Sequence, residues 1–154
     1  MTIREYLSEH DTITYRIYGV SMRPMLRQER DMVTLRRYDG SGLHKYDVAA
    51  YDLGGAQRNV LHRVVGVHGN HYTFLGDNCR CKEKQIPEEA IVAVLESFIR
   101  DGKVTSVHNI PYQIYARVHY ALYPVRIVRF QLISWAYRQQ WLRKIYHCII
   151  RREK

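Results

Sequence analysis

The 154-residue sequence contains few cysteines, no long apolar segment and almost no acidic residues near its C-terminus. Its three cysteines, Cys79, Cys81 and Cys148, have no framework spacing, which argues against a disulfide-stabilised scaffold. The first residues, "MTIREYLSEHD", are too charged to form the apolar region of a signal peptide. No run of 18 uncharged apolar residues exists, so no ordinary membrane-spanning helix is predicted. These absences together predict a protein of a reducing compartment, in the cytoplasm or peripheral to a membrane.

The shortage of acidic residues divides the chain into two parts. Residues 1–108 contain 15 Lys and Arg against 14 Asp and Glu, whereas residues 109–154 contain 9 against the single Glu153. The first part is therefore nearly neutral and the second strongly basic. We expect a body, 1–108, and a basic helical tail, 109–154, and we expect the tail to meet any anionic partner.

The body is rich in short β-branched runs separated by turn residues, which predicts a mainly β fold. A short helix is expected at residues 3–9. The expected strand segments are 12–18, 31–38, 46–53, 59–67, 71–77, and a strand, turn and strand within 90–107. The resulting fold class is a compact β body of short strands with an α-helical C-terminal extension.

In the tail, apolar and basic residues interleave at helical spacing, and Pro124 divides the segment into a short and a long helix. Its apolar positions include Val128, Leu132, Trp135, Leu142, Ile145 and Ile149. Three interpretations remain open. The tail packs on the body or on a second copy, docks a partner protein, or lies on an anionic membrane with Trp135 and Trp141 at the interface. Nucleic-acid binding is disfavoured, because no reader motif accompanies the charge.

The segment "YGVSMRPML", residues 18–26, raises the question of a nucleophile. Ser21 follows Gly19 by two positions and precedes Pro24, in a turn that can expose both its hydroxyl and its backbone N–H. A serine hydroxyl becomes a nucleophile when a base lies within hydrogen-bond reach. Taken alone, the pattern is more often that of a structural turn whose hydroxyl caps a backbone amide.

Two later segments supply groups that could activate such a serine. His62 lies inside a strand-like run, in phase with Val60 and Val64, and imidazole is well suited to general-base chemistry near neutral pH. Asp77 follows a strand within "LGDN" and could orient an imidazole. Each also has an ordinary interpretation, as a packed histidine and as an aspartate that caps its own turn.

The order of these motifs is more specific than any one of them. The chain carries, in sequence, "GVSMRPML", "ERDMVTL", "KYDVAAY", "HRVVGV" and "LGDN". This series resembles the signal peptidase and LexA-type clan of serine peptidases, over about residues 12–107. The resemblance implies a serine endopeptidase without a cofactor or a metal.

The resemblance also implies roles for individual residues. Ser21 matches the nucleophile and Met22 its usual companion, so Met22 and Pro24 are expected beside the substrate. His62 matches the general base, and Asp77 matches the aspartate that assists a histidine base.

The chain departs from the commonest family pattern at two positions. Most bacterial members have a lysine base, whereas His62 makes this chain similar to the endoplasmic-reticulum-type signal peptidase. Gly19 stands where signal peptidases place a hydroxyl, so the oxyanion hole is expected to consist of backbone groups at Gly19 and Ser21. The further acidic residue that often follows the family's Gly-Asp-Asn box has only Glu83 as a nearby counterpart.

The expected substrate is an extended precursor or leader-bearing peptide that pairs as a strand beside the site. Two alternatives remain: a catalytically silent module that binds extended peptides, and a self-processing regulator. The "CRC" segment, residues 79–81, could suggest metal binding, but further ligands at a standard spacing are absent. Free loop cysteines are therefore expected there.

Overall fold

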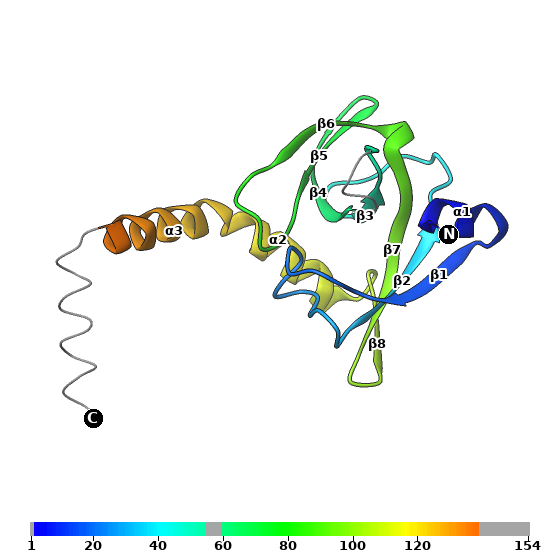
Figure 1. The fold of residues 1–154 in the computed structure, drawn as a ribbon, viewed down its shortest axis with the longest axis horizontal. Coiled ribbons are helices and arrows are strands. Elements are labelled where there is room, and N and C mark those ends of the chain that lie inside the picture. The colour runs from blue at the N-terminus through cyan, green and yellow to red at the C-terminus, as the bar shows by residue number, and fades with distance from the viewer. Residues whose placement is uncertain (1, 55–59, 139–154) are drawn as a thin grey trace. The chain divides into compact units, whose positions relative to one another are not determined.

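A computed structural model describes residues 2–54 and 60–138 of the chain (Figure 1). The chain divides into two compact units, Met1–Tyr120 and Ala121–Lys154. The first unit contains all the strands, and each unit is considered separately below.

The first unit begins with a short helix, α1 (Ile3–Glu9), and continues with eight strands. Thr2 caps α1: its hydroxyl accepts from the Glu5 backbone N–H, and the Glu5 carboxylate accepts from the Thr2 N–H. The strands are β1 (Thr12–Arg16), β2 (Met32–Arg37), β3 (Val48–Tyr51), β4 (Val60–His68), β5 (His71–Leu75), β6 (Glu83–Pro87), β7 (Ile91–Arg100) and β8 (Lys103–Ser106). A 3₁₀ turn, η1 (Glu88–Ala90), joins β6 to β7.

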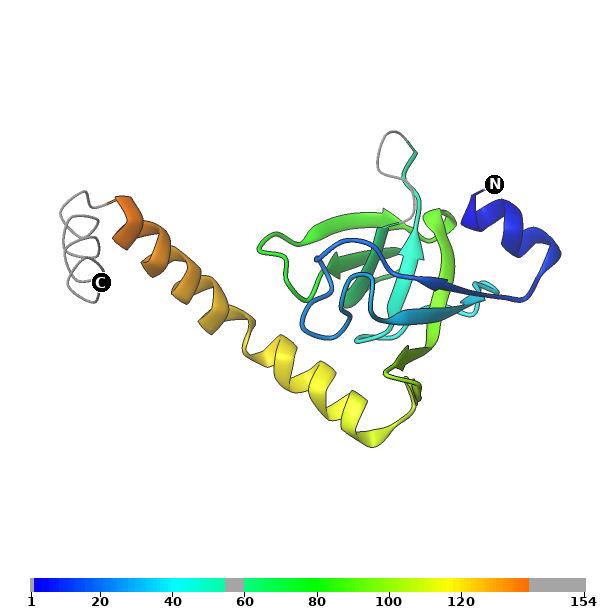
Figure 2. The same ribbon diagram turned by 60° about the horizontal axis from the view of Figure 1, so that its bottom comes forward.

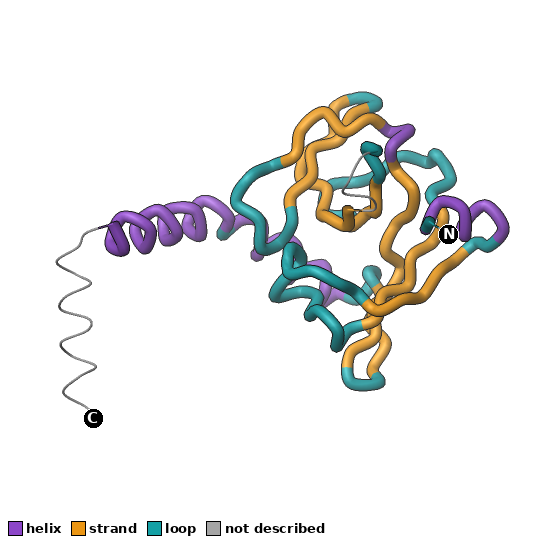
Figure 3. Tube along the Cα trace, in the orientation of Figure 1, coloured by secondary structure: helices purple, strands orange, loops and turns teal. Residues whose placement is uncertain are grey.

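All strand pairs are antiparallel, in the order β1-β2-β7-β3-β4-β5-β6, and β8 pairs with β7. Register shifts interrupt four of these pairings, for example between Val64 and Gly66 of β4. Such irregularities bend strands and increase their twist. Figures 1, 2 and 3 show the resulting sheet curling around its interior.

Two clusters of buried apolar side chains fill this unit. The larger one joins α1, through Leu7, to β2, β7 and the loop after β1. The smaller one lies around β3, β4 and β5 and includes Tyr51, Val64 and Phe74. The central strand β3 is buried along its whole length, so its sequence, "VAAY", shows no polar alternation.

Two helices follow the strands, α2 (Ile110–Ala121) and α3 (Tyr123–Arg138). Tyr112 and Ala116 of α2 are buried, and the Tyr112 ring packs 6.3 Å from that of Phe98. In α3, Pro124 is the second helical residue, where its missing N–H costs no internal hydrogen bond. Within the described residues, no helix is long and apolar enough to cross a membrane.

The prediction of a mainly β fold with C-terminal helices is confirmed. The predicted helix at 3–9 and the strand, turn and strand within 90–107 are also present. The two compact units divide between Tyr120 and Ala121, near the end of α2. Trp141, Cys148 and the other tail positions beyond residue 138 lie outside the described residues.

Candidate active site

Ser21 lies in the loop that connects β1 to β2. Gly19, two residues earlier, has φ of 95°, a left-handed conformation that glycine adopts without steric cost. Just after the serine, the side chains of Met22, Met25 and Leu26 are buried in the larger core cluster. These apolar side chains thus attach the turn to the core, while Ser21 itself is only partly buried.

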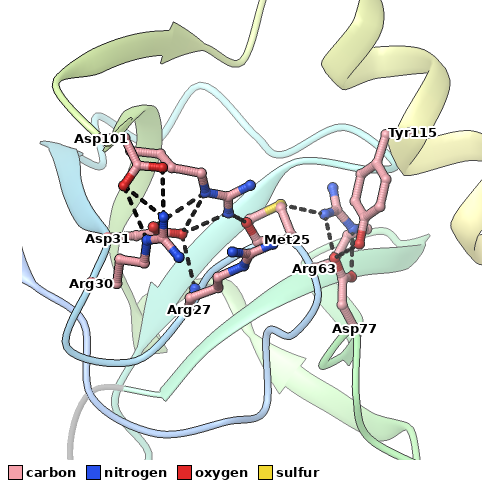
Figure 4. Close-up of polar contacts among 9 residues, drawn as sticks. Met25, Arg27, Arg30, Asp31, Arg63, Asp77, Asp101 and Tyr115 are labelled. Carbon is pink, nitrogen blue, oxygen red and sulfur yellow. Dashed lines mark hydrogen bonds and ion pairs between the residues drawn. The ribbon is translucent and has the colours of Figure 1, made fainter.

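Two arginines hold the same loop through polar contacts (Figure 4). Arg63 donates from Nη2 to the Met25 sulfur at 2.8 Å, and Arg100 donates to the Met25 carbonyl. Arg100 also pairs with the buried Asp31 at 2.6 Å, and the Arg27 backbone N–H donates to the same carboxylate at 2.9 Å. Burial alone would raise the pKa of Asp31, but these hydrogen bonds outweigh it and lower that pKa. The loop is therefore fixed at its middle and at its end.

The serine turn is joined directly to the turn after β5. The backbone N–H of Asn78 donates to the Ser21 carbonyl at 2.7 Å. A Cβ on Gly76 would lie 2.8 Å from that carbonyl oxygen and 2.9 Å from His62 Nε2. Because a side chain at position 76 would collide with both groups, only glycine lets the Ser21 backbone and the His62 ring approach the same point beside its Cα.

His62 comes from β4 and is 5% exposed. Its Nδ1 lies 2.9 Å from Glu83 Oε1 and 3.3 Å from the Tyr51 hydroxyl, which itself donates to Glu83. The carboxylate can only accept, so it places the ring proton on Nδ1 and leaves Nε2 as an acceptor. Burial lowers the pKa of His62, and the nearby negative charge of Glu83 opposes this only in part. The result is a neutral imidazole with an open nitrogen, as a general base requires.

The open nitrogen of His62 faces a thiol in this structure. Cys79 Sγ lies 3.9 Å from Nε2. Among the described residues, no hydrogen bond joins the Ser21 hydroxyl to the His62 ring. Ser21 and His62 therefore both approach Gly76 without a hydrogen bond between their side chains, and in enzymes such contacts commonly tighten only in the substrate complex.

Asp77 has a different set of partners from the one we expected. Its carboxylate accepts two hydrogen bonds from Arg63, at 2.9 and 2.8 Å, and a third from the Tyr115 hydroxyl at 3.1 Å (Figure 4). Both members of the ion pair are almost completely buried. We expected Asp77 to orient His62, but the carboxylate that lies at His62 Nδ1 is that of Glu83. Asp77 thus secures Arg63, and through it the serine loop and α2.

The other predicted site residues are divided between the surface and the core. Pro24 and Gly19 are exposed, so both can meet a bound peptide. Met22 is 2% exposed and packs in the core, which corrects the expectation that it contacts substrate. Its side chain instead fixes the turn that presents Ser21.

Sequence reasoning missed the roles of Glu83 and Tyr51. Glu83 was noted only as a nearby acid in the charged segment "CRCKEK", and nothing in that segment predicts a strand. The structure makes it the first residue of β6, directed at His62. The sequence signal for Tyr51 was its place in the "KYDVAAY" motif, where it was interpreted only as part of a strand.

The remaining polar features of this region do not assemble a metal centre. Within residues 2–54 and 60–138, no group of three or more potential ligands is placed to hold a metal ion. A cavity of about 830 Å³ lies on β4, β5 and β6, and it is lined by Val65, Gly66, His68, His71, Thr73, Lys82, Lys84 and Gln85. Ser21, His62 and Glu83 do not line this cavity, so it is separate from the serine site.

No protein-family model matches the chain, and a search of curated proteins finds no match to it.

Proposed function

We propose that the protein is a serine endopeptidase that acts on extended precursor or leader-bearing peptides, with Ser21 as nucleophile, His62 as general base and Glu83 as the carboxylate that orients the base. One observation carries this proposal. A buried, neutral histidine, bonded through Nδ1 to a carboxylate, directs its free nitrogen toward the glycine that contacts the serine turn. This is the base-and-orienter half of a serine hydrolase site.

In the proposed reaction, Ser21 Oγ attacks the scissile carbonyl and its proton passes to His62 Nε2. Glu83 stabilises the imidazolium that forms, and backbone N–H groups of the turn, including that of Ser21, stabilise the oxyanion. The imidazolium then gives its proton to the leaving amine, and water hydrolyses the acyl-enzyme by the same route in reverse. Neither a metal nor a cofactor takes part.

The substrate backbone is proposed to pair with an edge of the sheet. The strand order ends at β1 and β6, so each of these strands has one side without a strand neighbour among the described residues. The Ser21 loop begins after β1, and β6 carries Glu83. An extended peptide added at such an edge gains main-chain hydrogen bonds, and pockets for alternate side chains give selectivity.

The second candidate is a silent module that binds extended peptides without cleaving them. It is favoured by the disengaged state of Ser21 and by the thiol at His62 Nε2. A self-processing regulator is the third candidate.

The test combines a fluorophosphonate probe with a library of extended peptides followed by mass spectrometry. We expect the probe to modify Ser21 and Ser21→Ala to abolish both labelling and cleavage. We expect His62→Ala to reduce both by about 100- to 10,000-fold, the usual contribution of a positioned base. Ser41→Ala, in an exposed loop, is the matched control and should retain wild-type rates. Cleavage by Ser21→Ala at the wild-type rate would exclude the peptidase, and peptide binding without cleavage by wild type would establish the silent module.

We further propose that α3 places the enzyme on anionic membranes. The helix has no acidic residue, and its exposed apolar side chains are Val125, Val128, Leu132, Ile133 and Trp135. Its arginines, Arg126, Arg129 and Arg138, complement anionic lipid headgroups.

A further inference from the structure

The thiol of Cys79 lies beside the imidazole of His62. Cys79 lies in the turn after β5, where its backbone N–H donates to the Gly76 carbonyl at 2.8 Å. This turn places Sγ 3.9 Å from His62 Nε2, on the same side of Gly76 as the ring. Cys79, His62 and Glu83 therefore form a continuous series of nucleophile, base and carboxylate.

The same series shows that the thiol and the serine compete for one nitrogen. His62 Nδ1 is already occupied by Glu83, so Nε2 is the only ring nitrogen that can accept a proton. The Ser21 carbonyl and Cys79 Sγ both crowd the position of a Gly76 Cβ, at 2.8 and 2.6 Å. A group attached to the sulfur would therefore be attached at the point where the ring and the serine turn approach each other.

The protonation states fit this arrangement. Burial, with help from the negative charge of Glu83, raises the pKa of Cys79, so the sulfur carries its proton near neutral pH. Burial lowers the pKa of His62, so the ring is neutral. The thiol can then donate to Nε2, and the ring can take the proton when the sulfur attacks an electrophile.

We propose that Cys79 is a covalent modification site that shares the base of Ser21, and that a mixed disulfide formed there switches the serine off. This inference rests on the proposed function for its effect, but not for the modification itself. The co-reactant is a low-molecular-weight disulfide. Cys79 Sγ attacks one sulfur of the reagent, a new S–S bond forms and the reagent's S–S bond breaks. The thiol proton passes through His62 to the departing sulfur, so Cys79 is oxidised and the leaving sulfur is reduced to a thiol.

The partial exposure of Cys79 gives a small reagent access to it. Cys81, two residues along, is exposed and has no described contact with His62, so it is a matched control thiol. The experiment uses the full chain with Cys148→Ser, which leaves the two loop cysteines as the only thiols. The probe is 2-hydroxyethyl disulfide, with mass spectrometry to locate the adduct and fluorophosphonate labelling to report on Ser21.

We expect the disulfide to modify Cys79 and to lower Ser21 labelling by about 100-fold, because the base becomes inaccessible. A reductant should restore the labelling. In Cys79→Ala, the probe should label Ser21 equally with and without the disulfide. In Cys81→Ala, the disulfide should lower Ser21 labelling as much as it does in the parent protein. His62→Gln should slow adduct formation at Cys79 but not at Cys81, and this result does not depend on serine activity.

Three results would overturn the inference. The first is a Cys79 adduct that leaves Ser21 labelling unchanged, and the second is a Cys79→Ala variant whose Ser21 labelling is still lowered by the disulfide. The third is a His62→Gln variant in which the adduct at Cys79 forms at the parent rate. If the probe labels Ser21 neither in the parent protein nor in any variant, the proposed function fails. The His62 dependence of the Cys79 adduct then still decides whether the thiol uses this base.

Discussion

The buried ion pair between Arg63 and Asp77 offers the sharpest test of what Asp77 does. Replacement of Asp77 by Asn keeps the size of the side chain and removes its charge. If Asp77 holds Arg63, as the contacts indicate, this change leaves a buried guanidinium without its counter-ion. If Asp77 instead orients His62, as the family pattern implied, the change would damage chemistry more than stability.

The expected cost follows from the burial of the pair. The Arg63 and Asp77 side chains are 2% and 3% exposed. Breaking one partner of such a buried pair costs about 3–5 kcal/mol in unfolding free energy. For a chain of about this length, each kcal/mol lowers Tm by about 2–4 °C, so the total drop is about 6–20 °C. Asp101→Asn breaks a pair with Arg30 whose side chains are 51% and 58% exposed, and it should cost less than about 1 kcal/mol.

Urea denaturation and thermal melts followed by circular dichroism measure both variants beside the wild type. Adding Arg63→Met to Asp77→Asn removes the orphaned charge, so the double variant should lose less than the sum of the two single losses. Below the melting range, Asp77→Asn should still label at Ser21. Equal stability of Asp77→Asn and Asp101→Asn would refute the structural role. Loss of labelling in a variant of unchanged stability would return Asp77 to the catalytic site.

Two further predictions concern the base and the membrane. The charge of Glu83 raises the pKa of His62, whereas burial has a larger effect and lowers it. Glu83→Gln removes that charge, so the pKa of His62 should fall further. In the pH profile of the Ser21 labelling rate, the loss of labelling at acid pH should therefore move to lower pH. The plateau of this profile should fall by about 100-fold as the ring loses its orientation, and a shift of the acid loss to higher pH would contradict the assignment. Arg129→Gln in α3 should weaken sedimentation with phosphatidylserine vesicles by roughly fivefold, as one charge near the surface predicts. Lys103→Gln, on β8, is the control, and equal effects of the two changes or salt-independent binding would argue against α3 as the contact.

One signal by which the sequence predicts a strand is a difference in burial between its two faces. In β2, Val33 and Leu35 are buried and the residues next to them less so, and this alternation is visible in "DMVTLRRY". β6 could not be found in this way, because Ile86 is the only buried residue of "EKQIP". The pairing of β6 with β5 defines it as a strand, and its apolar pattern does not.

Glu83 could not be identified from the sequence because β6, the strand that carries it, has no apolar alternation. The geometry of β4 explains why Glu83, and not Asp77, contacts His62. His62 and Arg63 are consecutive in a strand, so their side chains leave on opposite faces of the sheet. Asp77 bonds the guanidinium on the Arg63 face, beside α2, while the His62 face meets the first residue of β6. Sequence order brought Ser21, His62 and Asp77 into one motif, but only strand pairing decides which carboxylate reaches Nδ1. In this chain β6 supplies it, so the carboxylate at His62 Nδ1 comes from an edge strand whose sequence is among the least strand-like in the body.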